Sequence, residues 1–131
     1  MTKQILIVDD EERVLFVLRN ILNKLRDSCQ VTTAHGGEAA LDVAREMSFD
    51  LVITDLIMQN TDGVELTEAL QELMPDAAMI WMTAYGCRQF RKDFERLGVY
   101  RCVDKPLEIH EVRQLVQEAL EDLERRQEQP M

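Results

Sequence analysis

Short apolar runs alternate along this chain with longer stretches in which apolar residues recur every three or four positions. A continuous apolar run is typical of a strand buried on both faces of a sheet, and the wider spacing is typical of an amphipathic helix. The runs predict five strands, at residues 5–8, 30–34, 51–53, 78–82 and 100–103. The helical spacing predicts five helices, over residues 14–25, 39–47, 64–73, 87–97 and 112–123.

This alternation predicts an α/β fold, in which a parallel sheet has helices on both faces and right-handed crossovers. The second strand is the least hydrophobic, which favours a place near the sheet edge. Asp10 is a candidate N-cap of the first helix, Pro75 is expected to stop the third, and Gly98 the fourth. We find no internal repeat or linker, so the pattern predicts one domain.

Composition narrows the classes of function. Hydrophobic residues make up 46% of the 131 residues, which excludes a disordered chain. No apolar run approaches the ~18 residues that a membrane-spanning helix needs. The 25 acidic and 15 basic residues give a net charge of −10, so we expect no direct binding to nucleic acid and none to a membrane. The first strand begins too early to leave room for a signal peptide, which predicts a cytoplasmic protein.

The cysteines and histidines indicate no metal site of their own. Cys29, Cys87 and Cys102 are odd in number and lack the paired spacing of metal ligands. They are interpreted as reduced thiols of a cytoplasmic protein, two of them in strands. His35 has no second histidine nearby, so it is interpreted as a solvated loop residue.

Polar side chains follow four of the predicted strands. The stretch from Phe49 to Gly63 is central, because its buried strand stops abruptly at Asp55. Asp9 and Asp10 follow the first strand, Thr83 the fourth and Lys105 the fifth. Parallel strands place their carboxyl ends at one edge of the sheet, so these side chains are expected to meet in one crevice. A purely structural interpretation, in which the acidic residues cap helices and start turns, covers only some of them.

Three carboxylates in one crevice repel one another unless a cation is present, and carboxylate oxygens suit Mg²⁺. Lys105 supplies a positive charge for a phosphoryl group, and the Thr83 hydroxyl can donate to a phosphate oxygen. A carboxylate held in this way can act as a nucleophile and form an aspartyl phosphate. The sequence therefore predicts phosphoryl transfer to Asp55.

Over nearly its whole length the chain resembles the receiver domain of two-component response regulators, the CheY-like superfamily. The matching segments are Ile-Leu-Ile-Val-Asp-Asp-Glu at 5–11, Asp-Leu-Ile-Met at 55–58 with Asp62-Gly63, Met-Thr-Ala-Tyr-Gly at 82–86 and Lys-Pro at 105–106. The resemblance implies a flavodoxin-like three-layer α/β/α sandwich, whose five-stranded parallel sheet has the order 2-1-3-4-5 and is flanked by five helices. It implies a receiver domain at 1–124, followed by a polar C-terminal tail at 125–131.

The resemblance also implies roles for individual residues. Asp55 is the expected phosphoacceptor, and Thr83 and Lys105 complete the catalytic set. The expected ligands of Mg²⁺, for which Mn²⁺ can substitute, are Asp9, Asp10, Asp55 and the carbonyl of Ile57. The bond from Lys105 to Pro106 is a candidate cis peptide.

Two residues depart from the family pattern. Gln59 stands where the family usually has proline, which should loosen the loop after Asp55. Cys102 stands where a switch aromatic is usual. Tyr100, expected on the same face of the strand as Cys102, and Tyr85 are candidates to take over that role.

The expected partners are a sensor histidine kinase or a histidine phosphotransfer protein, and a downstream effector protein or domain. No effector domain is expected within the residues after Pro106, so the chain is interpreted as a stand-alone regulator or a fragment of a longer one. Basic residues of the fourth helix and acidic residues of the last suggest a charged face, able to support a phosphorylation-dependent homodimer. These residues are Arg88, Arg91, Lys92 and Arg96, and Glu118, Glu121, Asp122 and Glu124.

Two other classes of function do not fit these residues. A dehalogenase-type phosphatase needs a second acid two residues after the nucleophile, where this chain has Ile57. A flavin-binding domain would need a phosphate loop rich in Ser, Thr or Gly after the first strand, where this chain has Asp9 and Asp10. The alternative that remains is an interaction module that uses the receiver fold without phosphorylation.

Overall fold

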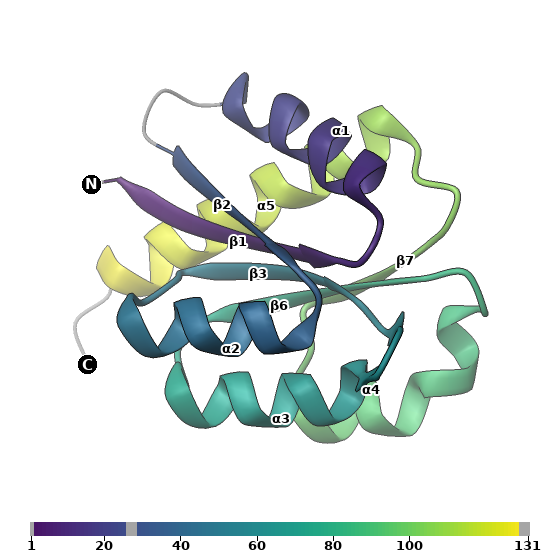
Figure 1. Ribbon diagram of the computed structural model, residues 1–131. Coiled ribbons are helices and arrows are strands. Elements are labelled where there is room, and N and C mark those ends of the chain that lie inside the picture. The colour runs from purple at the N-terminus through teal and green to yellow at the C-terminus, as the bar shows by residue number, and fades with distance from the viewer. Residues whose placement is uncertain (1, 26–28, 129–131) are drawn as a thin grey trace.

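A five-stranded parallel sheet lies at the centre of the protein (Figure 1). The computed structural model describes residues 2–25 and 29–128, with side chains as far as Arg126. The strands are β1 (Lys3–Asp9), β2 (Cys29–His35), β3 (Leu51–Asp55), β6 (Ala78–Thr83) and β7 (Arg101–Asp104). They pair in the order β2-β1-β3-β6-β7. Counted along the chain this is the order 2-1-3-4-5, so the prediction is confirmed.

Helices cover both faces of the sheet and complete three layers (Figure 1). On one face lie α1 (Glu12–Asn23) and α5 (Ile109–Glu128). On the other lie α2 (Gly37–Glu46), α3 (Gly63–Leu73) and α4 (Arg91–Leu97), the last preceded by a short 3₁₀ helix, η1 (Cys87–Phe90). The flavodoxin-like sandwich is therefore confirmed. In the described part of the chain no helix is both long and apolar enough to cross a membrane.

Alternating strand residues fill two separate cores. In β1, Ile5 and Ile7 face α1 and α5, whereas Leu6 and Val8 face α2 and α3. All four are fully buried, and each contributes roughly 1.5–3 kcal/mol by leaving water. Trp81 is the largest fully buried side chain, and its Nε1 donates to the Thr67 hydroxyl over 2.9 Å. The sheet is thus held rigidly between its helices, which fixes the positions of the strand ends.

Helix starts differ from one another in their capping. The predicted cap at Asp10 is wrong, because Glu11 occupies the N-cap position of α1 and no side chain caps that helix. Asp62 caps α3 by accepting from the backbone of Val64 and Glu65. The Asp10 carboxylate is consequently available for other contacts.

Some local features could not be predicted from periodicity. A small antiparallel hairpin of β4 (Ile57–Met58) and β5 (Thr61–Asp62) follows β3 and turns at Asn60, whose φ is +58°. The expected fourth helix begins as the 3₁₀ turn η1, and it ends at Gly98 as predicted. Helix α5 extends as far as Glu128, into the segment expected to be a tail. The boundary between domain and tail stays a prediction.

Cys87 and Cys102 form a disulfide, with their Cα atoms 5.9 Å apart. The prediction of reduced thiols is therefore wrong for this pair, although Cys29 and Cys102 do lie in strands, as expected. Linear spacing gave no sign of the bond, because Cys102 comes fifteen positions after Cys87, with all of α4 between them. The fold brings them together by placing η1 beside β7.

Candidate functional site

The predicted convergence of side chains occurs at the carboxyl edge of the sheet. Asp9 is the last residue of β1, and Asp55 is the last residue of β3. Together with Asp10 they form a cluster in which one carboxylate oxygen of each residue lies within 4.8 Å of the others. Asp9 and Asp55 are buried, and Asp10 is half-buried. Such a cluster of oxygen ligands could hold a divalent cation.

Lys105, directly after β7, bridges two of these carboxylates. Its Nζ lies 3.0 Å from Oδ2 of Asp9 and 3.1 Å from Oδ2 of Asp55. Burial by itself lowers the pKa of Lys105, but the hydrogen bonds to the two carboxylates outweigh it, and the pKa is raised above 10.5. The lysine therefore stays charged and neutralises part of the cluster.

Asp9 is the deepest of the three carboxylates, with no exposed surface. Burial raises its pKa above the ordinary value of 3.8, even though the Glu11 N–H and Lys105 both act to lower it. The Glu11 N–H donates to Oδ1 over 2.9 Å. Lys105 is thus stable in its charged form. Ionised Asp9 is destabilised by its burial, and a second cation would reduce that free-energy cost.

Backbone donors of the loop after β3 hold the other two carboxylates. The Ile57 N–H donates to Oδ1 of Asp55 over 3.2 Å, and the Gln59 N–H donates to Oδ2 of Asp10 over 3.0 Å. Proline has no N–H, so the second bond depends on a residue other than proline at position 59. Sequence reasoning missed these contacts, because backbone N–H groups have no residue signature. The ligand role of the Ile57 carbonyl stays a prediction.

Thr83 completes the edge of the crevice at the end of β6. Its side chain is buried, and its hydroxyl oxygen accepts from the Tyr85 N–H over 3.0 Å. Its carbonyl accepts from the Lys105 N–H over 2.8 Å, which ties the end of β6 to the residue after β7. The peptide bond from Lys105 to Pro106 is cis, as predicted.

Residues 5–117 match the response regulator receiver domain family. The chain belongs to this family. It is 32% identical over 120 residues to sporulation initiation phosphotransferase F of Bacillus subtilis (strain 168), which covers 92% of this chain and 95% of that protein.

Solved structures agree with the assignment. A CheY-like response regulator receiver domain protein from Methanospirillum hungatei JF-1 superposes with a TM-score of 0.88 at 25% identity, over 96% of this chain and 99% of the other. The response regulator protein TrrA from Thermotoga maritima, in complex with Mg(2+)-BeF, gives 0.76 at 30% identity, over 90% and 99%. This receiver domain is therefore a member of a signalling family in both sequence and fold.

The position predicted for Tyr100 needs correction, whereas its switch role stays a prediction. Tyr100 and Cys102 do not share a face of the sheet, because Tyr100 packs against the core under α1 and α5, and Cys102 against the core under α2, α3 and α4. Tyr100 precedes β7, so the alternation of the strand does not extend to it. Its hydroxyl donates to Asp122 in α5. Tyr85 comes two residues after Thr83 and has 60% of its surface exposed, and its switch role stays a prediction.

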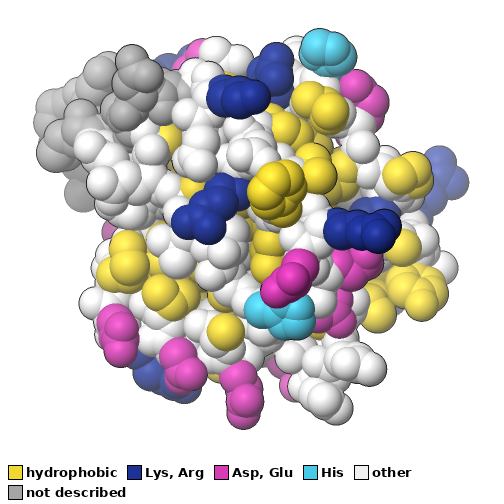
Figure 2. All heavy atoms as spheres, turned by 45° about the horizontal axis from the view of Figure 1, so that its top comes forward, with side chains coloured by type: hydrophobic (Ala, Val, Ile, Leu, Met, Phe, Trp, Pro, Cys, Tyr) yellow, Lys and Arg dark blue, Asp and Glu magenta, His cyan; other side chains and the backbone are white. Residues whose placement is uncertain are grey.

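An apolar hollow adjoins the carboxylate cluster in this receiver domain. It has a volume of about 320 Å³ and lies between α1 and the start of α5, with Lys105 and Pro106 in its wall. Val17 and Ile109, which also line it, are about half exposed. Figure 2, in which the top of Figure 1 comes forward, shows hydrophobic side chains exposed among charged ones. A protein surface could therefore contact apolar groups close to the crevice.

Proposed function

We propose that this receiver domain accepts a phosphoryl group on Asp55, in a Mg²⁺-dependent reaction, from a sensor histidine kinase or a histidine phosphotransfer protein. The observation that carries the proposal is the position of Lys105, whose ammonium contacts both Asp9 and Asp55 at the edge where three carboxylates meet. A structural ion pair would need one carboxylate. A second and a third carboxylate are explained by a site that takes up a cation and a phosphoryl group.

The donor set fits a magnesium site. Asp9, Asp10 and Asp55 supply hard oxygen ligands, and the Ile57 carbonyl is the expected fourth. When bound, the metal supplies neutralisation of charge on the transferred group. The acidic cluster carries more negative charge than Lys105 alone can balance, which favours this assignment.

The residues of the chain act in the transfer as follows. An Asp55 carboxylate oxygen forms a bond to phosphorus as the bond from phosphorus to the donor's histidine nitrogen breaks. Lys105, already 3.1 Å from Asp55, follows the new negative charge onto a phosphoryl oxygen. The Thr83 hydroxyl, which now accepts from the Tyr85 N–H, donates a hydrogen bond to another phosphoryl oxygen. When water attacks phosphorus, the bond from phosphorus to the Asp55 oxygen breaks, inorganic phosphate leaves and the carboxylate is restored, so the domain takes part in both its phosphorylation and its dephosphorylation.

A related protein supports the ligand chemistry. TrrA, 30% identical to this chain, is described in complex with Mg(2+)-BeF, and beryllofluoride mimics a phosphoryl group. The apolar hollow beside Lys105 is a suitable contact surface for the phosphoryl donor. Drawing Thr83 toward the phosphoryl group would disturb its bond to Tyr85, which links the site to α4 and to an effector protein or domain.

The proposal is tested by incubating the protein with acetyl phosphate and Mg²⁺ and measuring intact mass and phosphopeptides. We expect one phosphoryl group on wild type, none on Asp55→Asn, and none on wild type when EDTA replaces Mg²⁺. Asp76→Asn is the matched control, because Asp76 lies in the loop before β6, at the opposite end of the sheet. Equal labelling of wild type and Asp55→Asn would place the phosphate elsewhere and contradict the proposal.

A further inference from the structure

The disulfide between Cys87 and Cys102 joins the first residue of η1 to the middle of β7. Both cysteines are half-buried, so neither is sealed inside the core. The bond lies four residues after Thr83 and three residues before Lys105. It therefore connects the two chain segments that carry the phosphate-binding side chains of the proposed site.

The segment that follows Cys87 is weakly attached to the rest of the protein. None of residues 87–97 is buried, although Phe90 and Phe94 pack edge-on against Trp81 with ring centroids 6.5 and 6.2 Å away. Few buried apolar contacts mean a low local stability. The position of this segment must consequently depend on the specific bonds at its two ends.

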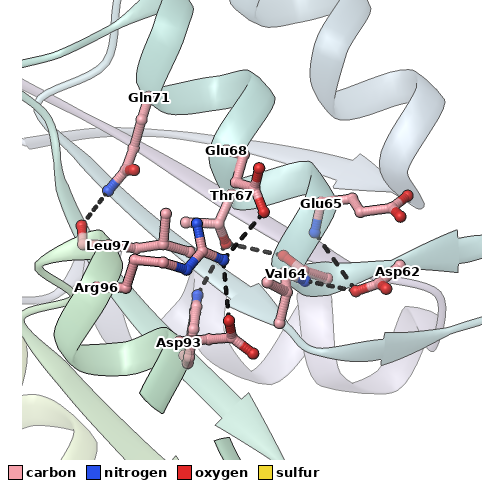
Figure 3. Close-up of polar contacts among 11 residues, drawn as sticks. Asp62, Val64, Glu65, Thr67, Glu68, Gln71, Asp93, Arg96 and Leu97 are labelled. Carbon is pink, nitrogen blue, oxygen red and sulfur yellow. Dashed lines mark hydrogen bonds and ion pairs between the residues drawn. The ribbon is translucent and has the colours of Figure 1, made fainter. Parts of the chain in front are cut away.

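The two ends of the segment are fastened differently. At the carboxyl end, Arg96 contacts Glu68 of α3, and the Gln71 side chain donates to the Leu97 carbonyl over 2.6 Å (Figure 3). At the amino end, the fastening is to β7, through the disulfide and through the Cys87 N–H, which donates to Asp104 over 2.9 Å. Opening the disulfide would therefore remove the covalent attachment of the end near Thr83 and leave the Cys87 N–H bond to Asp104, while the contacts to α3 hold the far end.

Only residues 84–86 separate Thr83 from the disulfide. The hydroxyl of Thr83 accepts from the Tyr85 N–H inside this short connection. A displacement of Thr83 must either be absorbed by three residues or be passed on to η1. With Cys87 covalently bound to β7, the second route is closed.

We propose that Cys87 and Cys102 form a reversible redox modification site, which takes small-molecule disulfides and dithiols as reactants, and that its oxidised form prevents movement of residues 84–97 when Asp55 is phosphorylated. The described structure is the oxidised form, in which the disulfide holds Cys87 to β7. The first part stands on the cysteine geometry alone, and the second part rests on the proposed function.

The redox step is a thiol–disulfide exchange. Starting from the dithiol, one cysteine thiolate attacks a sulfur of oxidised glutathione, forms a mixed disulfide and releases one glutathione. The second cysteine thiolate then displaces the other glutathione, and the two cysteine protons end on the two glutathione thiols. Both cysteines are half-buried, so a small thiol does not have to enter the core to react with the pair.

The first experiment measures the bond itself. The full chain is equilibrated in buffers with graded ratios of oxidised to reduced glutathione, trapped with a thiol-alkylating reagent and mapped by mass spectrometry. We expect a reversible two-electron transition confined to the Cys87–Cys102 pair, and an unchanged transition in Cys29→Ser. A pair that stays reduced at every ratio, or stays oxidised under excess dithiothreitol in the folded protein, overturns the proposal.

The second experiment measures the fastening by amide hydrogen exchange of residues 84–97, in oxidised and reduced protein, with and without Mg²⁺ and beryllofluoride. We expect roughly tenfold faster exchange on reduction, and a beryllofluoride response of this segment only in reduced protein. Cys102→Ser and Cys87→Ser should behave as reduced protein whatever the glutathione ratio. Equal exchange and an equal response in oxidised and reduced wild type overturn the proposal.

The same data separate this proposal from the proposed function. If beryllofluoride leaves residues 55–59 unchanged in both redox forms, the phosphoacceptor site is wrong. The effect of the disulfide on residues 84–97 is then still tested by comparing their hydrogen exchange in oxidised and reduced protein without beryllofluoride. If residues 55–59 respond in both forms and residues 84–97 respond in both forms, the phosphoacceptor site stands and the redox proposal fails.

Discussion

Asp9 is a fully buried carboxyl group in a cluster of three acidic residues that could hold a cation. Two contacts favour its ionised form, the Glu11 N–H and the Lys105 ammonium, yet burial still raises the pKa above 3.8. At pH values between the unfolded and the folded pKa of Asp9, the native protein therefore holds more protons than the unfolded chain. Ionisation of Asp9 therefore lowers the free energy of unfolding as the pH rises through that range.

This leads to a prediction for Asp9→Asn in the absence of metal. The free energy of unfolding of wild type should fall as the pH rises above 3.8 toward the raised folded pKa, by up to about 1.4 kcal/mol per pH unit for this group. Asp9→Asn should lose that part of the slope, because Asn does not titrate. Urea unfolding between pH 4 and 7 in EDTA gives both slopes. If the free energy of unfolding has the same dependence on pH in both proteins, the ionisation of Asp9 does not destabilise the fold and the prediction is wrong.

Among the elements, α3 is the one that shapes the loop after Asp55. Its first residue, Gly63, donates its N–H over 2.9 Å to the carbonyl of Leu56, the residue that follows Asp55. A Cβ at position 63 would lie 2.5 Å from that carbonyl oxygen and against the Leu56 backbone. Backbone atoms cannot move aside as a flexible side chain can. The glycine therefore serves a close approach of two backbone segments.

We predict that Gly63→Ala lowers the free energy of unfolding by about 1–3 kcal/mol, through overpacking against Leu56. The direction of the change in the free energy of unfolding distinguishes two effects, because alanine is the better helix former and without overpacking would stabilise α3 by ~1 kcal/mol. Chemical denaturation measures the change. Glu72→Ala, on an exposed position of the same helix, should change stability by no more than about 0.5 kcal/mol. A Gly63→Ala protein as stable as wild type would mean that the loop can retreat from α3.

Elements and site residues differ in how far the sequence could predict them. The strands and Asp9, Asp55 and Lys105 were predictable, because buried runs are contiguous and parallel strands share one carboxyl edge. The hairpin at Asn60 was not, since it depends on one left-handed residue without a neighbouring glycine. The disulfide and the Gln59 N–H bond were not either. They depend on which distant segments lie side by side, and this is set by the packing of η1 and of the loop after β3.

The whole molecule has 25 acidic and 15 basic residues, and part of this excess of negative charge is concentrated at the carboxylate cluster. Binding of Mg²⁺ to the folded state alone should stabilise it by mass action. At a concentration ten times the Kd the gain is about 1.4 kcal/mol, which corresponds to a rise of a few degrees in Tm. This gain in the free energy of unfolding should depend on the carboxylate cluster and not on the net charge of the surface.

We therefore predict that millimolar Mg²⁺ raises the Tm of wild type and leaves that of Asp10→Asn almost unchanged. Thermal unfolding followed by circular dichroism is the measurement. Because any salt screens the surplus of negative charge, NaCl at matched ionic strength is the control. A rise of the same size in NaCl, or in Asp10→Asn with Mg²⁺, would show that Mg²⁺ acts on the surface and not at the cluster.

The bridge from Lys105 to the two carboxylates has a consequence for the synthesis of the protein. Lys105 is 96 residues from Asp9 and 50 residues from Asp55. A ribosome adds the residues between Asp55 and Lys105 in roughly 3 to 10 s, and throughout that time the acidic residues are present without their lysine. A nascent or prematurely terminated chain can therefore pair β1 with β3 but has no complete crevice. Under the proposed function, the ability to accept a phosphoryl group therefore arises only after the last strand and Lys105 have been added.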